Sequence, residues 1–352
     1  MSNARDDAIA ASIRQAKEQK DFLGTVRIKS ELSEAKAQIA ALEAELQLSN
    51  DRLGVALALD AVPRSMPNLD PPKGPGGRGA FVLAFSDIHA AERVDKEQVG
   101  GRNEYSPSIC QKRVNKLIDQ ARWMIEAWRA GPNGYGWKID QIILWLGGDI
   151  MTGFIHDDLV ESNFMSPTEE VMFAQDLCVQ VIDALSAHDG IKRVEVPTSW
   201  GNHGRDTPDR RVATGWKRSY EWMMYRQIAK LYASNPNVRV HVGQDEITRL
   251  DVLGTKIRFT HGDQIKYGDG VGGLTIPLRK WLAKQDRTER ADLTIIGHHH
   301  QYLDLGDAVV NGSLIGWGAY AQRVAPYSPA SQVCCLIDEK YGKRMSTELI
   351  VQ

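Results

Sequence analysis

A short apolar run that ends in three consecutive histidines places the strongest constraint on how this chain folds. The run covers Leu293 to Ile296, reads as a buried strand, and is followed by Gly297 and then by His298, His299 and His300. Side chains on an extended segment alternate between its two faces, so we expect His298 and His300 to point one way and His299 the other. Two imidazoles on one side of a strand end indicate a metal site.

Four further apolar runs carry polar residues of the same kind at their C-terminal ends. These runs end in Asp87 and His89, in Asp149, in Asn202 and His203, and in His261. Each pattern taken alone is better explained by a polar turn or by a buried histidine with a hydrogen-bond partner than by a metal site. Because open α/β sheets form their sites at the carboxyl ends of their strands, five such ends in one chain predict a shared site.

The order of these motifs resembles the signature of the calcineurin-like metallophosphoesterase family, which reads D-x-H, G-D, G-N-H, H and G-H-x-H. The matching residues are Asp87-Ile-His89, Gly148-Asp149, Gly201-Asn-His203, His261 and Gly297-His-His-His300, and the resemblance covers roughly residues 80 to 350. The chain looks like the phage and bacterial branch of the family, which is often likened to DNA-repair exonucleases. The resemblance implies an α/β fold in which two packed mixed sheets are flanked by helices, a four-layer αββα sandwich. The alternation of strand-like and helix-like segments up to His300, followed by strands alone, fits the same architecture.

The resemblance also implies two divalent metal ions. Its first ligand set corresponds to Asp87, His89, Asp149 and His300, and its second to Asp149, Asn202, His261 and His298, with Asp149 as the bridge. Nitrogen and oxygen ligands of this kind admit manganese, iron, zinc or a mixed pair, and manganese is our prediction. The two carboxylates neutralise only half of the four positive charges of two divalent ions, so the metal pair keeps a net positive charge that attracts a phosphate ester.

Three further residues have roles that depend on this site. In the resembling family the histidine of G-N-H, here His203, is not a ligand but protonates the leaving oxygen or stabilises the transition state, work that suits a histidine. The alternative is a structural histidine. His299 should face away and pack or support a neighbouring ligand. Asp263 either orients His261 or belongs to an ordinary turn.

The N-terminal part of the chain has a different composition. Residues 1–60 read as a helix, with leucine or isoleucine at heptad spacing at Leu32, Ile39, Leu46 and Leu53. We expect residues 30–60 to form a coiled coil that supports a homo-oligomer or docks a partner; the alternatives are a helix folded back on the catalytic domain and a frayed helix. Residues 61–79 are rich in proline and glycine and predict a linker, which leaves 80–352 as the catalytic domain.

Composition limits the location and the chemistry of the protein. No apolar stretch reaches the roughly 18 residues of a membrane span and the first residues are polar, so we expect a cytoplasmic protein without a membrane partner. Four cysteines fit neither a disulfide framework nor a zinc spacing. A formal net charge of −2 gives no general attraction to nucleic acid, so such binding must come from a local patch or from the metals.

A basic segment follows His203 and bears on the substrate. Arg205, Arg210 and Arg211 lie near Trp216 and other aromatic residues, a combination that can bind phosphates and stack on bases. The alternative is a helix with a solvated basic face and core aromatics. Gly204 stands where many relatives carry an acidic residue, and the segment after Asp149 lacks the continuation that marks phosphoprotein phosphatases.

The sequence therefore predicts a two-metal phosphodiesterase, with a hydroxide that bridges the metals as the nucleophile and with DNA or RNA as the leading substrate. Two alternatives remain open. One is a phosphomonoesterase that acts on a phosphoprotein or a nucleotide, and the other is a non-catalytic interaction protein that keeps the fold.

Overall fold

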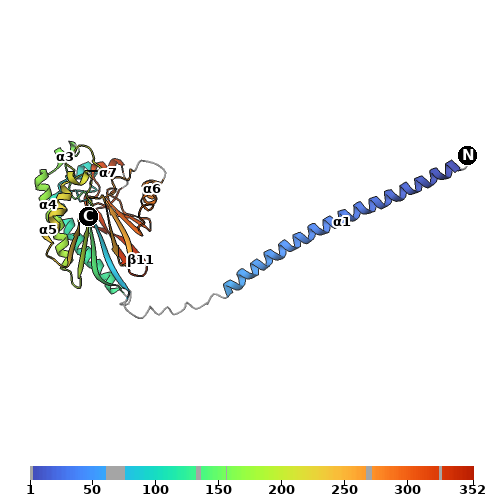
Figure 1. The fold of residues 1–352 in the computed structure, drawn as a ribbon, viewed down its shortest axis with the longest axis horizontal. Coiled ribbons are helices and arrows are strands. Elements are labelled where there is room, and N and C mark those ends of the chain that lie inside the picture. Colours follow the sequence, from blue (N-terminus) through green and yellow to red (C-terminus); the bar gives the residue numbers. More distant parts are fainter. Residues whose placement is uncertain (1–2, 61–75, 132–135, 156, 267–271, 325–326) are drawn as a thin grey trace. The chain divides into compact units, whose positions relative to one another are not determined.

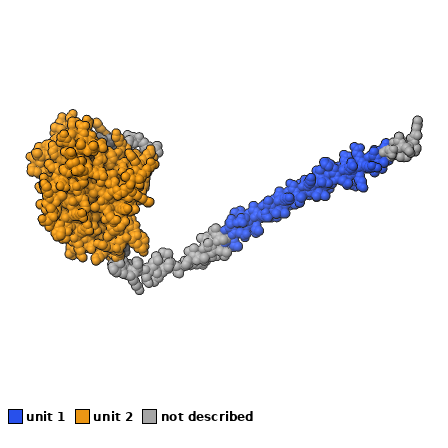
Figure 2. Space-filling model, viewed as in Figure 1, with its two compact units in different colours: residues 1–70 blue, residues 71–352 orange. Residues whose placement is uncertain are grey.

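A computed structural model describes residues 3–60, 76–131, 136–155, 157–266, 272–324 and 327–352. The chain divides into two compact units, residues 1–70 and 71–352, which are coloured separately in Figure 2. Most of the predicted linker, residues 61–75 of 61–79, lies outside the described residues, and Arg78 and Gly79 belong to the first strand.

The first unit contains one helix, α1 (Asn3–Asp60), 58 residues long. Its side chains are exposed throughout Ala8 to Leu53. Its polar contacts are local, such as the bond from Arg27 Nε to Glu31 Oε1 at 2.9 Å one turn away. The predicted N-terminal helix is therefore present, and its apolar residues are solvent-exposed in the single chain. No helix among the described residues is both long enough and apolar enough to cross a membrane.

The second unit is built on two mixed sheets. The first has the order β11-β10-β1-β2-β3-β4 and contains β1 (Arg78–Phe85), β2 (Lys138–Leu146), β3 (Arg193–Pro197), β4 (Val238–His241), β10 (Ser331–Asp338) and β11 (Gly342–Ile350). Strands β1 to β4 run parallel to one another, and β10 is antiparallel to both of its neighbours.

The second sheet has the order β5-β6-β7-β9-β8. It contains β5 (Ile247–Val252), β6 (Thr255–Thr260), β7 (Leu293–Ile296), β8 (Leu303–Asp304) and β9 (Ala308–Val310). Strands β6, β7 and β9 are parallel, while β5 and β8 are antiparallel edge strands. Both sheets therefore contain parallel strands, whose carboxyl ends can form a site.

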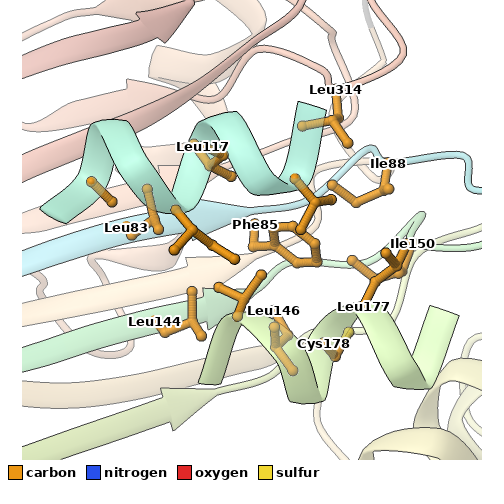
Figure 3. Packing of buried hydrophobic residues seen from close by; sticks show 14 of the residues in the cluster. Leu83, Phe85, Ile88, Leu117, Leu144, Leu146, Ile150, Leu177, Cys178 and Leu314 are labelled. Carbon is orange, nitrogen blue, oxygen red and sulfur yellow. The ribbon is translucent and has the colours of Figure 1, made fainter. Parts of the chain in front are cut away.

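The buried apolar residues show how the layers pack. Figure 3 shows Phe85 and Leu144 of the first sheet against Leu117 of α2 (Pro107–Ala130) and Leu177 of α4 (Pro167–Ser186), and α5 (Tyr220–Leu231) joins the same cluster. A second cluster lies between the sheets, where the rings of Trp145 and Phe259 are 6.0 Å apart. In a third, α6 (Thr275–Gln285) packs on β7 and β9. The predicted four-layer αββα sandwich is confirmed, with α4 and α5 on one side and α6 on the other (Figure 1).

Strand β1 is buried and apolar from Gly79 to Phe85. Phe81, Leu83 and Phe85 face the helices, while Val82 and Ala84 face the other sheet. Because both faces of the strand are covered, neither can be polar. The same argument holds for β2, where Leu144 and Trp145 face opposite layers.

Local polar groups set where the helices begin. Ser166 and Glu169 form a reciprocal capping box at the start of α4. Helix α5 begins at Tyr220 because Ser219 is extended and caps Trp222 N at 3.2 Å, and Gly215–Arg218 before it form a 3-10 turn. The described residues also include η1 (Lys96–Val99), α3 (Asp157–Ser162) and α7 (Ala319–Val324).

The core between the sheets should dominate stability. Leu293 of β7 is 1% exposed in that core, whereas Leu231 at the end of α5 is 61% exposed. Leu293→Ala should lower the free energy of unfolding by about 2 to 5 kcal/mol, because it removes buried methyl groups and leaves a cavity. Leu231→Ala is the matched control and should change it by no more than about 0.5 kcal/mol. Urea unfolding followed by circular dichroism measures both, and equal effects would contradict the layer assignment.

Candidate metal centre

The polar residues singled out in the sequence lie at the carboxyl ends of parallel strands from both sheets. Strands β1, β2 and β3 are followed by Asp87, Asp149 and Asn202, and β6 and β7 by His261 and His298. Backbone bonds join adjacent loops, as in Asp87 N to the Gly148 carbonyl at 3.0 Å and Gly297 N to the His261 carbonyl at 2.8 Å. The two sheets are joined by His298 N, which donates to Asp87 Oδ1 at 2.8 Å.

Ligand-type atoms converge there in three overlapping groups. Within each group the atoms lie no more than 4.8 Å apart, and the groups are Asp87, His89 and His300; Asp149, His261 and His298; and His89, Asp149 and His203. Each of the first two groups contains three of the four residues of one predicted ligand set, and Asp149 also lies close to His89 of the first set. These clusters of histidine and aspartate are able to bind metal ions.

Several contacts within the groups suit a bound cation. His89 Nε2 and His300 Nε2 face each other at 3.3 Å, and His261 Nε2 lies 2.9 Å from Asp149 Oδ2. Asn202 Oδ1 is buried and has no hydrogen-bond partner among the described residues. Since a buried acceptor without a partner is costly, Asn202 Oδ1 is a candidate metal ligand.

The backbone at these residues is unusual. Asp87, His89, Asp149, His298 and His300 all have positive φ, between 49° and 69°. For residues other than glycine this conformation costs on the order of 1 kcal/mol or more each, and such strain tends to collect at functional sites. These residues follow β1, β2 and β7, so the chain leaves the extended conformation soon after each of those three strands.

This backbone corrects one expectation. We expected His298 and His300 to share one face of an extended strand, but β7 ends at Ile296 and both histidines are left-handed. His298 lies with Asp149 and His261, while His300 lies with Asp87 and His89. The turn, and not strand alternation, therefore distributes the imidazoles between two neighbouring groups.

The glycines of the motifs are required by close approach. A Cβ at Gly201 would lie 2.0 Å from Asp149 Oδ1, and a Cβ at Gly297 would lie 2.4 Å from Asp87 Oδ2. Either side chain would displace the carboxylate beside it. The loops after different strands can therefore meet only because these two positions carry no side chain.

His203 is held at the edge of the groups. Its backbone N donates to Asp149 Oδ1 at 2.8 Å, and its ring stands perpendicular to that of His89 with the centroids 4.7 Å apart. Nδ1 lies 2.7 Å from the Thr152 carbonyl, which can only accept, so Nδ1 carries a proton in this contact. Nε2 is then the nitrogen at which a second proton can be gained or lost. Burial lowers the pKa of His203.

Asp263 and His299 are the two residues for which we expected a role beside the metal ligands. His261 Nδ1 bonds to the Gly147 carbonyl at 2.8 Å, so a backbone group orients this ring, and Asp263 instead pairs with Arg210 Nε at 2.9 Å. The Gly147 carbonyl, and not Asp263, is therefore the hydrogen-bond partner of His261 Nδ1. His299 is in none of the groups of converging ligand atoms among the described residues, and its ring stacks edge-on against His298 with the centroids 5.1 Å apart.

A pocket adjoins the groups on the side of Asn202 and His261. The three predicted substrate-binding residues Arg205, Arg210 and Arg211 all line it. Arg210 pairs with Asp263 and with Glu246 at 3.0 Å, and Arg205 NH1 donates to the Asn202 carbonyl at 2.7 Å. Of the aromatic residues in this segment, Tyr225 is part of the core, whereas Trp216 stacks on Trp222 with the ring centroids 4.8 Å apart.

Sequence reasoning missed two buried glutamates that bond to the loop after Asp149. Glu170 Oε1 and Oε2 accept from Thr152 N at 2.5 Å and Gly153 N at 3.1 Å, and Glu221 accepts from Ile150 N at 2.7 Å. Both lie in the first turn of a helix, where glutamate is common. Their helical spacing could have indicated that they are buried, because Glu170 lies on the same face of α4 as its buried apolar residues and Glu221 on the buried face of α5.

The charges in the two groups are strongly coupled. Burial alone would raise the pKa of Asp149, but the charges of His261 and the neighbouring imidazoles, with the hydrogen bond to His261, together hold that pKa well below its usual value. Burial alone would lower the pKa of His261, but the charge and hydrogen bond of Asp149, with the charges of nearby aspartates, together raise it well above the ordinary histidine value. Without a metal, therefore, protons on imidazoles balance the buried carboxylates.

Comparison with known proteins gives only distant similarity. No family model matches the chain, and no curated protein matches it. Among solved structures it is similar to Vacuolar Protein Sorting 29 from Cryptosporidium parvum, at 14% identity over 77% of this chain and 98% of that chain with a TM-score of 0.32. It is also similar to a predicted phosphoesterase from Streptococcus pneumoniae, at 13% identity over 77% and 97% with a TM-score of 0.29. A third is the sulfate thiohydrolase SoxB from Thermus thermophilus, at 12% identity over 80% and 57% with a TM-score of 0.31. These values assign no activity, and the fold rests on the sheet order and layers described above.

Metal binding should release protons. His261, with its raised pKa, carries a proton at pH 7 on Nε2, and this proton must leave before the nitrogen can bind a cation. Mn²⁺ binding should therefore release at least about one proton at pH 7, and the affinity should fall as the pH falls. Calorimetric titration in buffers of different ionisation enthalpy measures this release. A binding enthalpy that is the same in every buffer would contradict the assignment, and His261→Gln should reduce the release.

Proposed function

We propose that this chain is a metal-dependent phosphoesterase that uses two divalent ions to hydrolyse phosphodiester bonds, with nucleic acid as the leading substrate. The observation that carries the proposal is the convergence of two ligand groups, Asp87–His89–His300 and Asp149–His261–His298, at strand ends from both sheets. The charge and donor types suit manganese, iron or zinc, and manganese is the first ion to test.

The residues of the chain divide the chemistry among them. Two bound cations would supply an activated water and neutralise charge on the phosphate oxygens. Asp87 and Asp149, which are 0% and 1% exposed, offset half of that positive charge, so the site keeps an attraction for an anionic ester. His203 holds Nδ1 against the Thr152 carbonyl and passes a proton from Nε2 to the leaving oxygen.

The pocket supports a diester over a monoester. Arg205 and Arg211 line it beside Asn202 and His261, so a substrate that reaches the metal residues can extend over them. A monoester ends at its phosphate and has no second group for this pocket. Guanidinium groups can bind flanking phosphates.

Metal analysis and turnover test the proposal together. The purified full-length chain should contain or take up two equivalents of Mn²⁺ and should cleave bis-p-nitrophenyl phosphate faster than p-nitrophenyl phosphate. Activity on the monoester alone would favour a phosphomonoesterase, and a protein that binds no metal and cleaves neither ester would favour an interaction protein. Single-stranded DNA, double-stranded DNA, RNA and a phosphopeptide then separate the substrate classes.

His203→Ala should keep metal binding and lose turnover. His203 belongs to neither of the two predicted ligand sets, but it carries the proton for the leaving oxygen, so kcat should fall about a hundredfold or more. His188→Ala is the matched control, because His188 lies at the end of α4 and pairs with Glu126 at 2.8 Å. Turnover of His203→Ala within a few-fold of the unchanged protein would refute the role.

We also propose that residues 30–60 of α1 associate with a second copy of the chain. Leu32, Ile39 and Leu46 repeat every seven residues and are 53%, 55% and 62% exposed, which leaves an apolar stripe open to solvent in the single chain. A second copy presents the same stripe with the same period. In a parallel pair Glu31 of one helix lies opposite Lys36 of the other, a favourable match of charges.

Charge placed in this stripe should break the association. Leu46→Glu sets two carboxylates against each other in the seam, whereas Leu48→Glu, two residues further on and 51% exposed, lies outside the heptad stripe. Analytical ultracentrifugation should therefore find Leu46→Glu monomeric and Leu48→Glu associated like the unchanged chain. A monomeric unchanged chain, or equal behaviour of the two variants, would rule out this seam.

A further inference from the structure

Glu221 joins the loops after two different strands through a single carboxylate. The side chain is 0% exposed. Oε1 accepts from Ile150 N at 2.7 Å and from Met151 N at 3.3 Å, and Oε2 accepts from Gly201 N at 2.7 Å. The first two amides follow Asp149 directly, and the third precedes Asn202 directly. One carboxylate therefore holds the loop that follows β2 and the loop that follows β3 together.

The third loop, after β1, is attached to the same backbone. Ile88 N and His89 N both donate to the Asp149 carbonyl, at 2.8 and 3.1 Å, and Ala90 N donates to the Ile150 carbonyl at 3.0 Å. Displacement of the segment Asp149–Ile150 would therefore move His89 as well. The contacts of Glu221 thus reach residues of both ligand groups although Glu221 belongs to neither.

Gly204 leaves the space that Glu221 occupies. A Cβ at this position would lie 2.7 Å from Glu221 Cγ and 3.1 Å from its Cδ. The two segments are also joined by Tyr220 N, which donates to the Gly204 carbonyl at 2.8 Å at the start of α5. The position after His203 therefore carries no acidic side chain, and the carboxylate of Glu221, from α5, lies beside that position instead.

We infer that Glu221 is a positioning residue, which holds Asp149 and Asn202 in the geometry that binds metal, and that Gly204 is required to admit its carboxylate. Glu170 is a second positioning residue with a different target. Its carboxylate accepts from Thr152 N and Gly153 N, and the Thr152 carbonyl in turn bonds to His203 Nδ1 at 2.7 Å. Glu221 therefore acts on the metal ligands, and Glu170 acts on the orientation of His203.

The pair allows a test in which each residue is the control for the other. This inference rests on the proposed function only where kcat is measured. Metal binding and amide hydrogen exchange can be measured in an inactive protein. Glutamine keeps the shape of the side chain but turns one acceptor into a donor, which then opposes a backbone N–H. Glu221→Gln in the full-length chain should raise the Kd for Mn²⁺ about tenfold or more, as loss of a residue that supports metal ligands commonly does.

Glu170→Gln should leave the Kd for Mn²⁺ within about threefold and should lower kcat about tenfold, because only the support of His203 is lost. Hydrogen exchange of the metal-free proteins adds a readout that needs neither metal nor turnover. Glu221→Gln should lose protection at Ile150 and Gly201, and Glu170→Gln at Thr152 and Gly153. An unchanged Kd in Glu221→Gln, or equal changes in the two variants, would overturn the inference.

A pair of glycine variants tests the same geometry without removing a carboxylate. Gly204→Ala should displace Glu221 and raise the Kd for Mn²⁺ about as much as Glu221→Gln does. Gly215→Ala is the control, since the nearest atom to its added Cβ is Trp200 Nε1 at 3.6 Å, an ordinary contact. If Gly204→Ala binds Mn²⁺ as tightly as Gly215→Ala, the inference is wrong. If the protein without substitutions binds Mn²⁺ but cleaves no ester, the proposed function is wrong. The effect of the variants on the Kd for Mn²⁺ still tests the positioning role of Glu221.

Discussion

The carboxylate of Asp149 is the group on which the rest of the site depends. It is 1% exposed, accepts from His203 N through Oδ1, and lies 2.9 Å from His261 Nε2 through Oδ2. A buried anion is costly unless positive charge surrounds it, and here the imidazoles supply that charge as protons or by binding cations. The polar groups at the ends of β2, β3 and β6 therefore stabilise one buried negative charge, that of Asp149.

The geometry that surrounds this charge comes from strained and crowded loops. Five of the candidate ligands have positive φ, and Gly201 and Gly297 leave room for the carboxylates of Asp149 and Asp87. Such a backbone persists only where surrounding contacts over-determine it. Glu170 and Glu221 supply those contacts from the helix layer, so α4 and α5 contribute to the site as well as to the core.

The sequence predicted the layers and the residues that converge, because strand period, apolar runs and motif order are local signals. It could not predict how the chain leaves a strand. The assignment of His298 and His300 to one face assumed that β7 continued beyond Ile296, and the left-handed turn there follows from contacts with other loops. Glu170 and Glu221 were missed for a related reason. A glutamate in the first turn of a helix is ordinary, and only the folded chain shows that the amides it meets belong to the loop after Asp149.

The same contacts limit what the arginines can do. Arg210 is paired with two carboxylates, Glu246 and Asp263, and Arg205 donates to the carbonyls of Asn202, Thr207 and Pro208. The charge of Arg210 is therefore largely balanced before a substrate arrives, and the guanidinium of Arg205 already donates to backbone carbonyls. In the proposed phosphoesterase the attraction for an anionic ester then falls mainly to the cations. Because a cation pair attracts any phosphate alike, selectivity among esters must come from the shape of the pocket, which Arg205 and Arg210 help to set by holding the loop after His203.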